Sequence, residues 1–179
     1  MNRTLLVIDI QNDYFPGGLL PLWQAEETEA RIVAAIHAAR ARGDGIVLVQ
    51  HVSTAPSGFM AAGGSGVLIR QAVLDAAGGA PVVTKHVADA FQDTDLASHL
   101  PGSGELLVCG MMTQNCVVFT AMSRDADPYK VRVVGDLCTA PTEVVHRIAL
   151  NALRCRAARL TRFAPGAIAP ILRPCRCRH

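Results

Sequence analysis

The chain has 179 residues, which is enough for one domain with a proper hydrophobic core. Half of the residues are hydrophobic and only 4% are aromatic, so we expect a core of Ala, Val, Leu and Ile, and the composition excludes a disordered chain. The formal net charge of +2 is too small to indicate a nucleic acid or an anionic membrane as a partner.

Apolar runs alternate with helical stretches along the chain. In chain order, the pattern predicts a strand over 4–9, a helix over 26–42, a strand over 46–51, a helix over 67–77, a short strand over 81–84, a short helix over 93–100, a strand over 105–109, a helix over 113–124, a strand over 129–134, a helix over 141–158 and a possible sixth strand over 159–163.

Several predicted strands are continuous apolar runs without alternation, notably 5–8 and 46–49. Such runs are typical of strands buried on both faces, which indicates a parallel sheet covered by helices. The repeated β-α order favours a three-layer α/β/α fold with an open, doubly wound sheet. We expect one domain over 1–165 and a C-terminal tail over 166–179. The long irregular loop over 55–66 is a candidate substrate-side lid.

No apolar stretch is long enough for a transmembrane helix, and the N-terminus has no signal-peptide pattern. We therefore expect a cytoplasmic protein whose six cysteines are reduced. Cys109, Cys138 and Cys155 lie in apolar surroundings and are interpreted as small core residues. Cys175 and Cys177 form a C-x-C in the tail, which is weak evidence for a metal site.

Cys116 is the most informative cysteine because it follows a buried strand and a short turn and opens a predicted helix. The positive end of the helix dipole and unpaired backbone N–H groups there favour a thiolate. The sequence therefore predicts a cysteine nucleophile.

Two further chemically useful residues also follow predicted strands. Asp9 comes at the end of the first strand and Lys85 at the end of the third. Ligands of doubly wound sheets bind outside the C-terminal ends of the strands, where these side chains and Cys116 are expected to meet. Taken singly, Asp9 could be a helix cap and Lys85 a surface lysine. A single mechanism uses all three, because the carboxylate accepts the thiol proton and the ammonium stabilises the thiolate.

Three segments resemble the signature segments of the isochorismatase-like cysteine hydrolases. They are Asp-Ile-Gln-Asn-Asp-Tyr-Phe-Pro-Gly-Gly at 9–18, Val-Thr-Lys-His at 83–86 and Cys-Gly-Met-Met-Thr-Gln-Asn-Cys-Val at 109–117. The resemblance covers nearly the whole chain, and it implies a sheet of six strands in the order 3-2-1-4-5-6. It implies a catalytic triad of Asp9, Lys85 and Cys116. It also implies a cis peptide bond between Met111 and Met112, with the backbone N–H groups of Met112 and Cys116 forming an oxyanion hole.

The resemblance implies a hydrolase that cleaves a small amide or related C–N bond through a thioester. Two alternatives stay open: hydrolysis of a vinyl ether such as isochorismate, which needs no thiol, and a non-catalytic scaffold. Family members that deamidate nicotinamide carry an Asp and two His after the second strand. Residues 51–60 contain one histidine and no acid, so we expect no metal and no other cofactor.

The substrate pocket is expected to use Phe15, His51, Phe59 and Phe91 from the strand ends and loops. The alternative is that these aromatic rings close the edge of the core. Together they suggest a small, partly apolar amide.

Three other polar residues lie near the predicted site in the sequence. His86 is expected to be a hydrogen-bonding neighbour of the lysine and not a base. Gln114 and Asn115 either bind substrate or cap the helix.

The remaining histidines, His37, His99 and His146, lie on predicted helices and are expected to face solvent or a subunit contact. The expected partners are a small-molecule substrate and further copies of the chain, as a homodimer or homotetramer. Both the resemblance and the strongly apolar last helix favour self-association.

Overall fold

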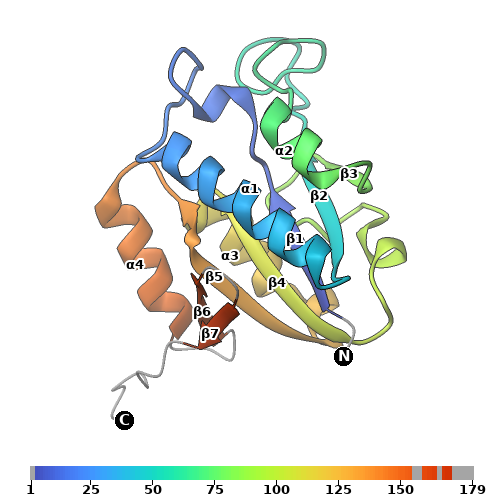
Figure 1. Ribbon diagram of the computed structural model, residues 1–179. Coiled ribbons are helices and arrows are strands. Elements are labelled where there is room, and N and C mark those ends of the chain that lie inside the picture. Colours follow the sequence, from blue (N-terminus) through green and yellow to red (C-terminus); the bar gives the residue numbers. More distant parts are fainter. Residues whose placement is uncertain (1–2, 155–158, 165–166, 171–179) are drawn as a thin grey trace.

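The computed structural model describes residues 3–154, 159–164 and 167–170 (Figure 1). These residues form a twisted sheet with helices on both faces. The strands are β1 (Arg3–Ile8), β2 (Gly45–His51), β3 (Val82–Lys85), β4 (Gly104–Met111), β5 (Tyr129–Thr139), β6 (Arg159–Ala164) and β7 (Ala167–Pro170). They lie in the order β3-β2-β1-β4-β5-β6-β7.

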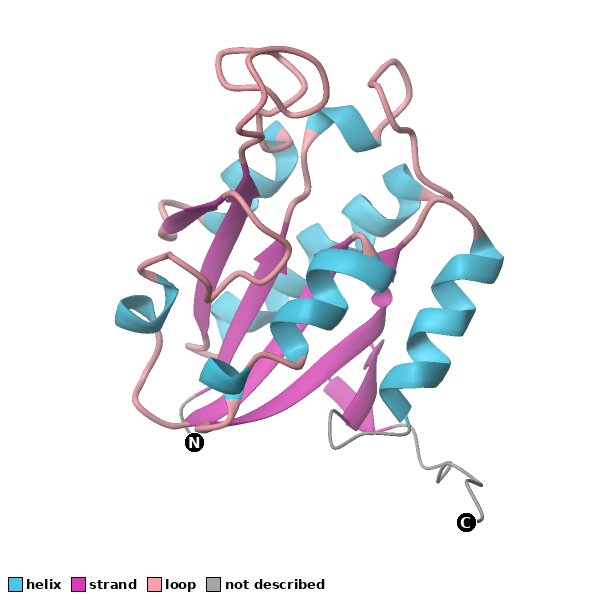
Figure 2. Ribbon diagram, turned by 180° about the vertical axis from the view of Figure 1, so that it is seen from behind, coloured by secondary structure: helices cyan, strands magenta, loops and turns pink. Residues whose placement is uncertain are grey.

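The helices form the two outer layers. α1 (Ala25–Ala41) and α2 (Gln71–Ala77) lie in front of the sheet in Figure 1. α3 (Val118–Ala121) and α4 (Glu143–Arg154) cover the opposite face, which Figure 2 turns toward the reader. The described residues also contain four short turns: η1 (Asn12–Tyr14), η2 (Leu96–His99), η3 (Thr113–Val117) and η4 (Arg124–Ala126). Of these, η3 is a π-helical turn. The predicted three-layer α/β/α fold is confirmed.

The strand order 3-2-1-4-5-6 is also present, and all neighbouring pairs from β3 to β6 are parallel. The sheet differs from the six-stranded prediction because β7 pairs with β6 in the antiparallel direction. β7 lies within the segment expected to be a C-terminal tail. Its pairing uses the backbone groups that β6 would otherwise leave open at the edge of the sheet.

Three helices are shorter than the sequence predicted. The helix over 113–124 is a π-helical turn followed by a single α-turn, and the helix over 93–100 reduces to η2. α2 begins at Gln71 because Val67 and Ile69 are engaged elsewhere: Ile69 bridges to Gln11, whose side-chain amide also binds the Val67 carbonyl. Tertiary hydrogen bonds therefore override the local helical pattern.

β1 is the centre of the sheet, and its apolar residues from Leu5 to Ile8 are at most 1% exposed. It contacts β2 on one side and β4 on the other. Gly110 allows β4 to lie this close, because a Cβ atom there would lie 2.1 Å from the Ile8 carbonyl oxygen, and its φ of 121° also favours glycine. A side chain at this position would push apart the two strands that carry the site.

Replacing Gly110 by Ala is therefore expected to destabilise the protein by about 3 kcal/mol or more, through overpacking and backbone strain together. Urea unfolding followed by circular dichroism measures the change. The matched control is Gly102→Ala, since no heavy atom lies within 4 Å of a Cβ there and its φ is not positive. Equal stability of the two variants would contradict this account of the β1–β4 contact.

Of the histidines expected at the surface, His37 and His99 are exposed, as predicted. The expectation for His146 is wrong, because this residue of α4 is only 8% exposed and its side chain contacts Thr113 of η3. Cys109 and Cys138 are buried free thiols, as expected, whereas Cys155, Cys175 and Cys177 lie outside the described residues. No helix in the described part of the chain has the length and apolar character to cross a membrane.

Candidate active site

Asp9, Lys85 and Cys116 come together at the C-terminal edge of the sheet. Asp9 follows β1 directly, Lys85 is the last residue of β3, and Cys116 lies in η3 after β4. Lys85 Nζ lies 2.8 Å from Asp9 Oδ2 and 3.2 Å from Cys116 Sγ. β2 separates β3 from β1, so the long lysine side chain reaches across the end of β2 to meet the carboxylate. Asp9 and Lys85 are both fully buried.

The backbone turns sharply at Asp9. Its φ of 53° lies in the left-handed region, which aspartate tolerates better than most residues. Its N–H still donates to the Val49 carbonyl of β2 at 3.0 Å, while its own carbonyl accepts from Gln11 N at 2.9 Å. The strand therefore ends at this residue, and a carboxylate is left at the edge of the sheet beside β2.

The Lys85 ammonium has four close neighbours for three N–H groups. Besides Asp9 and Cys116, it donates to the Val87 carbonyl at 3.1 Å and lies 3.3 Å from His51 Nδ1. These contacts replace the water that burial removes from the charge. Asp9 is the shortest and only anionic contact, so the ion pair is the main compensation for burying the ammonium.

Burial and the ion pair shift the pKa values of the cluster. Burial raises the pKa of Asp9, and the nearby Lys85 charge opposes the shift without reversing it. Burial acts to lower the pKa of Lys85, but the charges of Asp9 and Cys116 outweigh it and raise that pKa. Burial and the Lys85 charge lower the pKa of His51, so its imidazole is neutral near pH 7.

The thiol behaves differently from the sequence expectation. Burial, followed by the Asp9 charge, raises the pKa of Cys116 to about 12, and Lys85 only partly offsets this. The predicted preference for thiolate at a helix N-terminus is therefore wrong for the free enzyme. One π-helical turn and one α-turn give a weak dipole, and desolvation prevails over it. The thiol therefore rests in its neutral form beside the Asp9–Lys85 ion pair.

Replacing Asp9 by Asn should lower the pKa of Cys116, because the variant removes the negative charge that disfavours the thiolate and keeps Lys85 3.2 Å away. Thiolate absorbance at 240 nm, titrated against pH, measures this pKa. Subtracting the same titration of Cys116→Ser removes the contribution of the other five cysteines. An unchanged or higher midpoint in Asp9→Asn would show that Asp9 does not act electrostatically on the thiol.

Of the expected pocket residues, His51 contacts the cluster through Lys85, and Phe59 packs on Tyr14. His51 is half-buried, and its backbone is held by the Gln11 side chain, which donates to His51 O at 2.7 Å and accepts from His51 N at 2.8 Å. Phe59 is half-buried and packs on Tyr14, with ring centroids 5.5 Å apart. Both side chains therefore retain some exposure beside the site.

Phe15 and Phe91 pack elsewhere. The Arg70 guanidinium carbon lies 4.3 Å from the centroid of the Phe15 ring, and Phe15 is 2% exposed. Phe91 is 6% exposed and stacks with Tyr129 at 6.3 Å. Both rings fill the edge of the core, which was the other interpretation of loop aromatics, and their place in a substrate pocket stays a prediction.

Tyr14 is a residue that the sequence reasoning did not select. Its side chain is 2% exposed, and burial, followed by the charges of Asp9 and Cys116, raises its pKa well above the usual range. The phenol therefore stays protonated close to the two acids of the cluster. The sequence feature that could have selected Tyr14 is its position within the Asp9–Gly18 segment, which carries the family resemblance.

The candidate lid over 55–66 is anchored to the site by Asp13, which is 4% exposed. Its carboxylate accepts from Met60 N at 2.6 Å and from Leu19 N at 3.2 Å, and its N–H donates to Gly66 O. The loop over 55–66 and the segment over 12–24, which contains Asp13, lie at the top of Figure 1, at the C-terminal edge of the sheet. In this conformation one buried carboxylate joins them, and movement of the loop as a lid stays a prediction.

The remaining polar candidates are peripheral. His86 is exposed, and its Nδ1 lies 2.8 Å from the Val52 carbonyl, so its ring is held by the backbone near Lys85. Gln114 contacts the Met112 sulfur, and its Oε1 is buried without a hydrogen-bond partner among the described residues. η3 has no side-chain cap, so neither Gln114 nor Asn115 acts as a cap.

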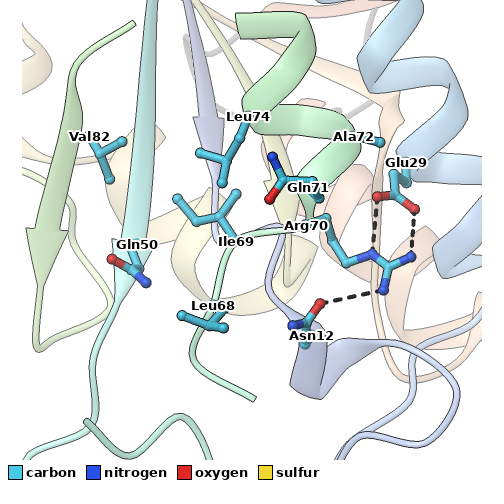
Figure 3. Close-up of a pocket in the computed structure, with 10 residues that line it drawn as sticks. All are labelled: Asn12, Glu29, Gln50, Leu68, Ile69, Arg70, Gln71, Ala72, Leu74 and Val82. Atoms are coloured by element: carbon cyan, nitrogen blue, oxygen red, sulfur yellow. Dashed lines mark hydrogen bonds and ion pairs between the residues drawn. The ribbon is translucent and has the colours of Figure 1, made fainter. Parts of the chain in front are cut away.

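A separate hollow of about 650 Å³ lies beside β2 and β3. Figure 3 shows the residues that line it. Arg70 borders it, and the Arg70 guanidinium is held by Glu29 at 3.0 Å and by Asn12 at 3.4 Å. Leu68, Ile69, Leu74 and Val82 supply much of the rest of the lining. No residue of the Asp9–Lys85–Cys116 cluster lines this hollow, so it is distinct from the reactive centre.

Residues 3–154, 159–164 and 167–170 contain no group of three or more His, Cys, Asp or Glu side chains that could hold a metal ion. The peptide bond between Met111 and Met112 is cis, as the family resemblance implied. It joins the end of β4 to the residue before η3, at the base of the turn that carries Cys116.

Comparison with known proteins gives matches to one family. The isochorismatase domain model matches residues 3–164. An uncharacterized isochorismatase family protein, YddQ of Bacillus subtilis, is 35% identical over 145 residues, which cover 79% of this chain and 80% of YddQ. The crystal structure of an isochorismatase family protein from Desulfovibrio vulgaris superposes with a TM-score of 0.78 at 28% identity, covering 89% of this chain and 93% of the other.

A more distant structure has the same fold. The pyrazinamidase of Pyrococcus horikoshii, solved in complex with zinc, gives a TM-score of 0.78 at 20% identity, covering 91% of this chain and 100% of that one. The α/β/α fold and the matched domain define a hydrolase of the isochorismatase type. The chain belongs to the isochorismatase family.

Proposed function

We propose that the protein hydrolyses a small amide or a related C–N bond through a thioester on Cys116. The observation that carries this proposal is the buried contact of Lys85 Nζ with both Asp9 Oδ2, at 2.8 Å, and Cys116 Sγ, at 3.2 Å. A nucleophile, a base and a fixed positive charge within hydrogen-bond reach are the parts that covalent catalysis needs.

In the first step the thiol proton passes from Cys116 to Asp9. The transfer keeps the buried site neutral, because a thiolate and a carboxylic acid replace a thiol and a carboxylate while Lys85 stays charged. Burial already raises the pKa of Asp9, which makes it a better proton acceptor. Asp9 Oδ1 has no hydrogen-bond partner among the described residues, so it is open to receive the proton.

In the second step the thiolate attacks the carbonyl carbon and forms a C–S bond. The backbone N–H groups of Met112 and Cys116 hold the oxyanion, and loss of one such donor costs about 3–4 kcal/mol of barrier. The C–N bond then breaks, and Asp9 gives its proton to the leaving amine. Water hydrolyses the thioester with Asp9 as base, which releases the acid and restores the thiol.

The amide substrate class is favoured over a vinyl ether because a vinyl ether is hydrolysed by acid catalysis and makes no use of a thiol. A pyrazinamidase shares this fold, so the fold accommodates an amidase. Tyr14, Phe59 and His51 lie beside the cluster and suggest a small, partly apolar substrate. No cofactor enters these steps, since the chain's own residues supply the nucleophile, the base and the charge.

Replacing Cys116 by Ala should lower turnover by at least about 10³-fold and leave the fold intact, because the variant removes the atom that forms the intermediate. The assay screens amides, ureides, carbamoyl compounds and isochorismate for product, with mass spectrometry of acid-quenched enzyme to detect a thioester. The matched control is Cys138→Ala, which removes a buried thiol that does not contact Asp9 or Lys85.

Three results would contradict the proposal. Near-normal turnover by Cys116→Ala would remove the nucleophile. Conversion of isochorismate alone, without an adduct, would favour the vinyl-ether hydrolase. Absence of any turnover, together with equally slow alkylation of Cys116 and the other cysteines, would favour a scaffold.

We also propose that the chain forms a homodimer or homotetramer through the layer made by α3 and α4. Four large apolar side chains are exposed on these helices or directly after α3: Phe119 at 56%, Met122 at 40%, Val144 at 66% and Ile148 at 66%. Glu143 and Arg147 lie among them and pair at 3.5 Å. Such a surface carries both charges, so it can face a second copy of itself across a two-fold axis.

Replacing Ile148 by Lys is expected to shift the protein toward monomer, because the buried centre of an interface does not tolerate an unpaired charge. Light scattering after size exclusion measures the mass. Leu68→Lys is the control, since Leu68 is 54% exposed next to α2, on the opposite face. A monomeric wild type, or an unchanged mass of the Ile148 variant, would exclude this interface.

A further inference from the structure

A buried hydroxyl lies at the start of the turn that carries Cys116. Thr113 is the first residue of η3, and its side chain is fully buried. Its Oγ1 lies 2.8 Å from the Thr139 carbonyl oxygen, at the end of β5, and 2.9 Å from His146 Nδ1, on α4. These contacts join three elements that are far apart in the sequence.

The chemistry of the groups sets the direction of these hydrogen bonds. The Thr139 carbonyl can only accept, so Thr113 uses its single hydroxyl proton there. The hydroxyl oxygen then accepts from His146, which must carry its proton on Nδ1. Burial and the neighbouring Arg31 charge lower the pKa of His146, so the imidazole is neutral and this tautomer is the one that satisfies both contacts.

A second contact, with Trp23, also holds the His146 ring. Its ring packs against the Trp23 ring, with centroids 5.8 Å apart. Trp23 is fixed in turn to the end of β5, because its N–H donates to the Ala140 carbonyl at 3.0 Å and the Thr139 hydroxyl donates to its carbonyl. The imidazole therefore contacts both the Trp23 ring and the Thr113 hydroxyl.

The turn needs such an anchor because it has little helix to hold it. Within η3, Asn115 N and Val117 N both bind the Met112 carbonyl, and only the four residues of α3 follow. A helix this short is not stable by itself in water. Thr113 precedes Cys116 by three residues, so a shift of Thr113 moves the sulfur relative to Lys85 Nζ.

We propose that His146 is a positioning residue that holds Thr113, and through it the Cys116 sulfur, in place beside Lys85. His146 does not touch the reacting atoms. The effect on turnover rests on the proposed amidase function. The effect on the thiol itself does not, because alkylation of Cys116 by iodoacetamide reports the Cys116–Lys85 contact without any substrate.

The test compares Thr113→Val and His146→Leu, which remove the hydrogen bond, with Thr113→Ser and His146→Asn, which keep a donor or acceptor at the same place. We expect the first two to alkylate Cys116 about tenfold more slowly and to lose about 10–100-fold in kcat with little change in KM, since small misplacements of a reacting atom cost this much. Thr113→Ser and His146→Asn should keep most of the wild-type alkylation rate and most of the wild-type kcat.

Thr120→Val is the matched control, because Thr120 is another fully buried threonine, on α3, whose hydroxyl binds Ala90 N and not His146. Near-ultraviolet circular dichroism shows that each variant is folded, and if Thr113→Val is not, the His146 pair decides alone. Wild-type or faster alkylation of Cys116 in the folded His146→Leu variant overturns the proposal. A loss of alkylation rate in His146→Asn as large as that in His146→Leu also overturns it. If alkylation responds as expected but no amide is turned over, the positioning role stands and the proposed function fails.

Discussion

The structure depends on one buried positive charge. Lys85 is fully buried and lies against Asp9, Cys116, His51 and a backbone carbonyl. Removing one member of a buried ion pair typically costs about 3–5 kcal/mol, because it leaves the other charge without compensation. The same ammonium opposes the rise that burial causes in the pKa values of Asp9 and Cys116. Stability and chemistry therefore share a single contact.

The sheet determines where that contact lies. β1 and β4 are neighbours in the sheet, although residues 9–103 separate them in the sequence. Asp9 follows β1, and the turn with Cys116 follows β4. Their close approach at Gly110 keeps the two residues at one edge, and Lys85 reaches them from β3 across the end of β2. The site thus lies where the strand order changes direction, which is where open α/β sheets bind ligands.

Around this centre, buried polar groups hold the loops. Asp13 joins the two loops over the site, Gln11 fixes the backbone of His51, and His146 binds Thr113 at the base of the Cys116 turn. These contacts are made by short polar side chains to backbone or hydroxyl groups, in places where regular secondary structure is brief. A short π-helical turn can keep Cys116 in position because its neighbours supply the rigidity that its own length does not.

The sequence by itself determined the layers and the choice of Asp9, Lys85 and Cys116, since continuous apolar strands and their C-terminal ends are local patterns. The family resemblance added the strand order 3-2-1-4-5-6 and the cis bond at Met111–Met112. Only the tertiary structure decided the seventh strand, the short helix after Cys116, the burial of His146, the packing of Phe15 and Phe91 and the raised pKa of the thiol. These features depend on desolvation and on partners distant in the chain, and a sequence pattern contains neither.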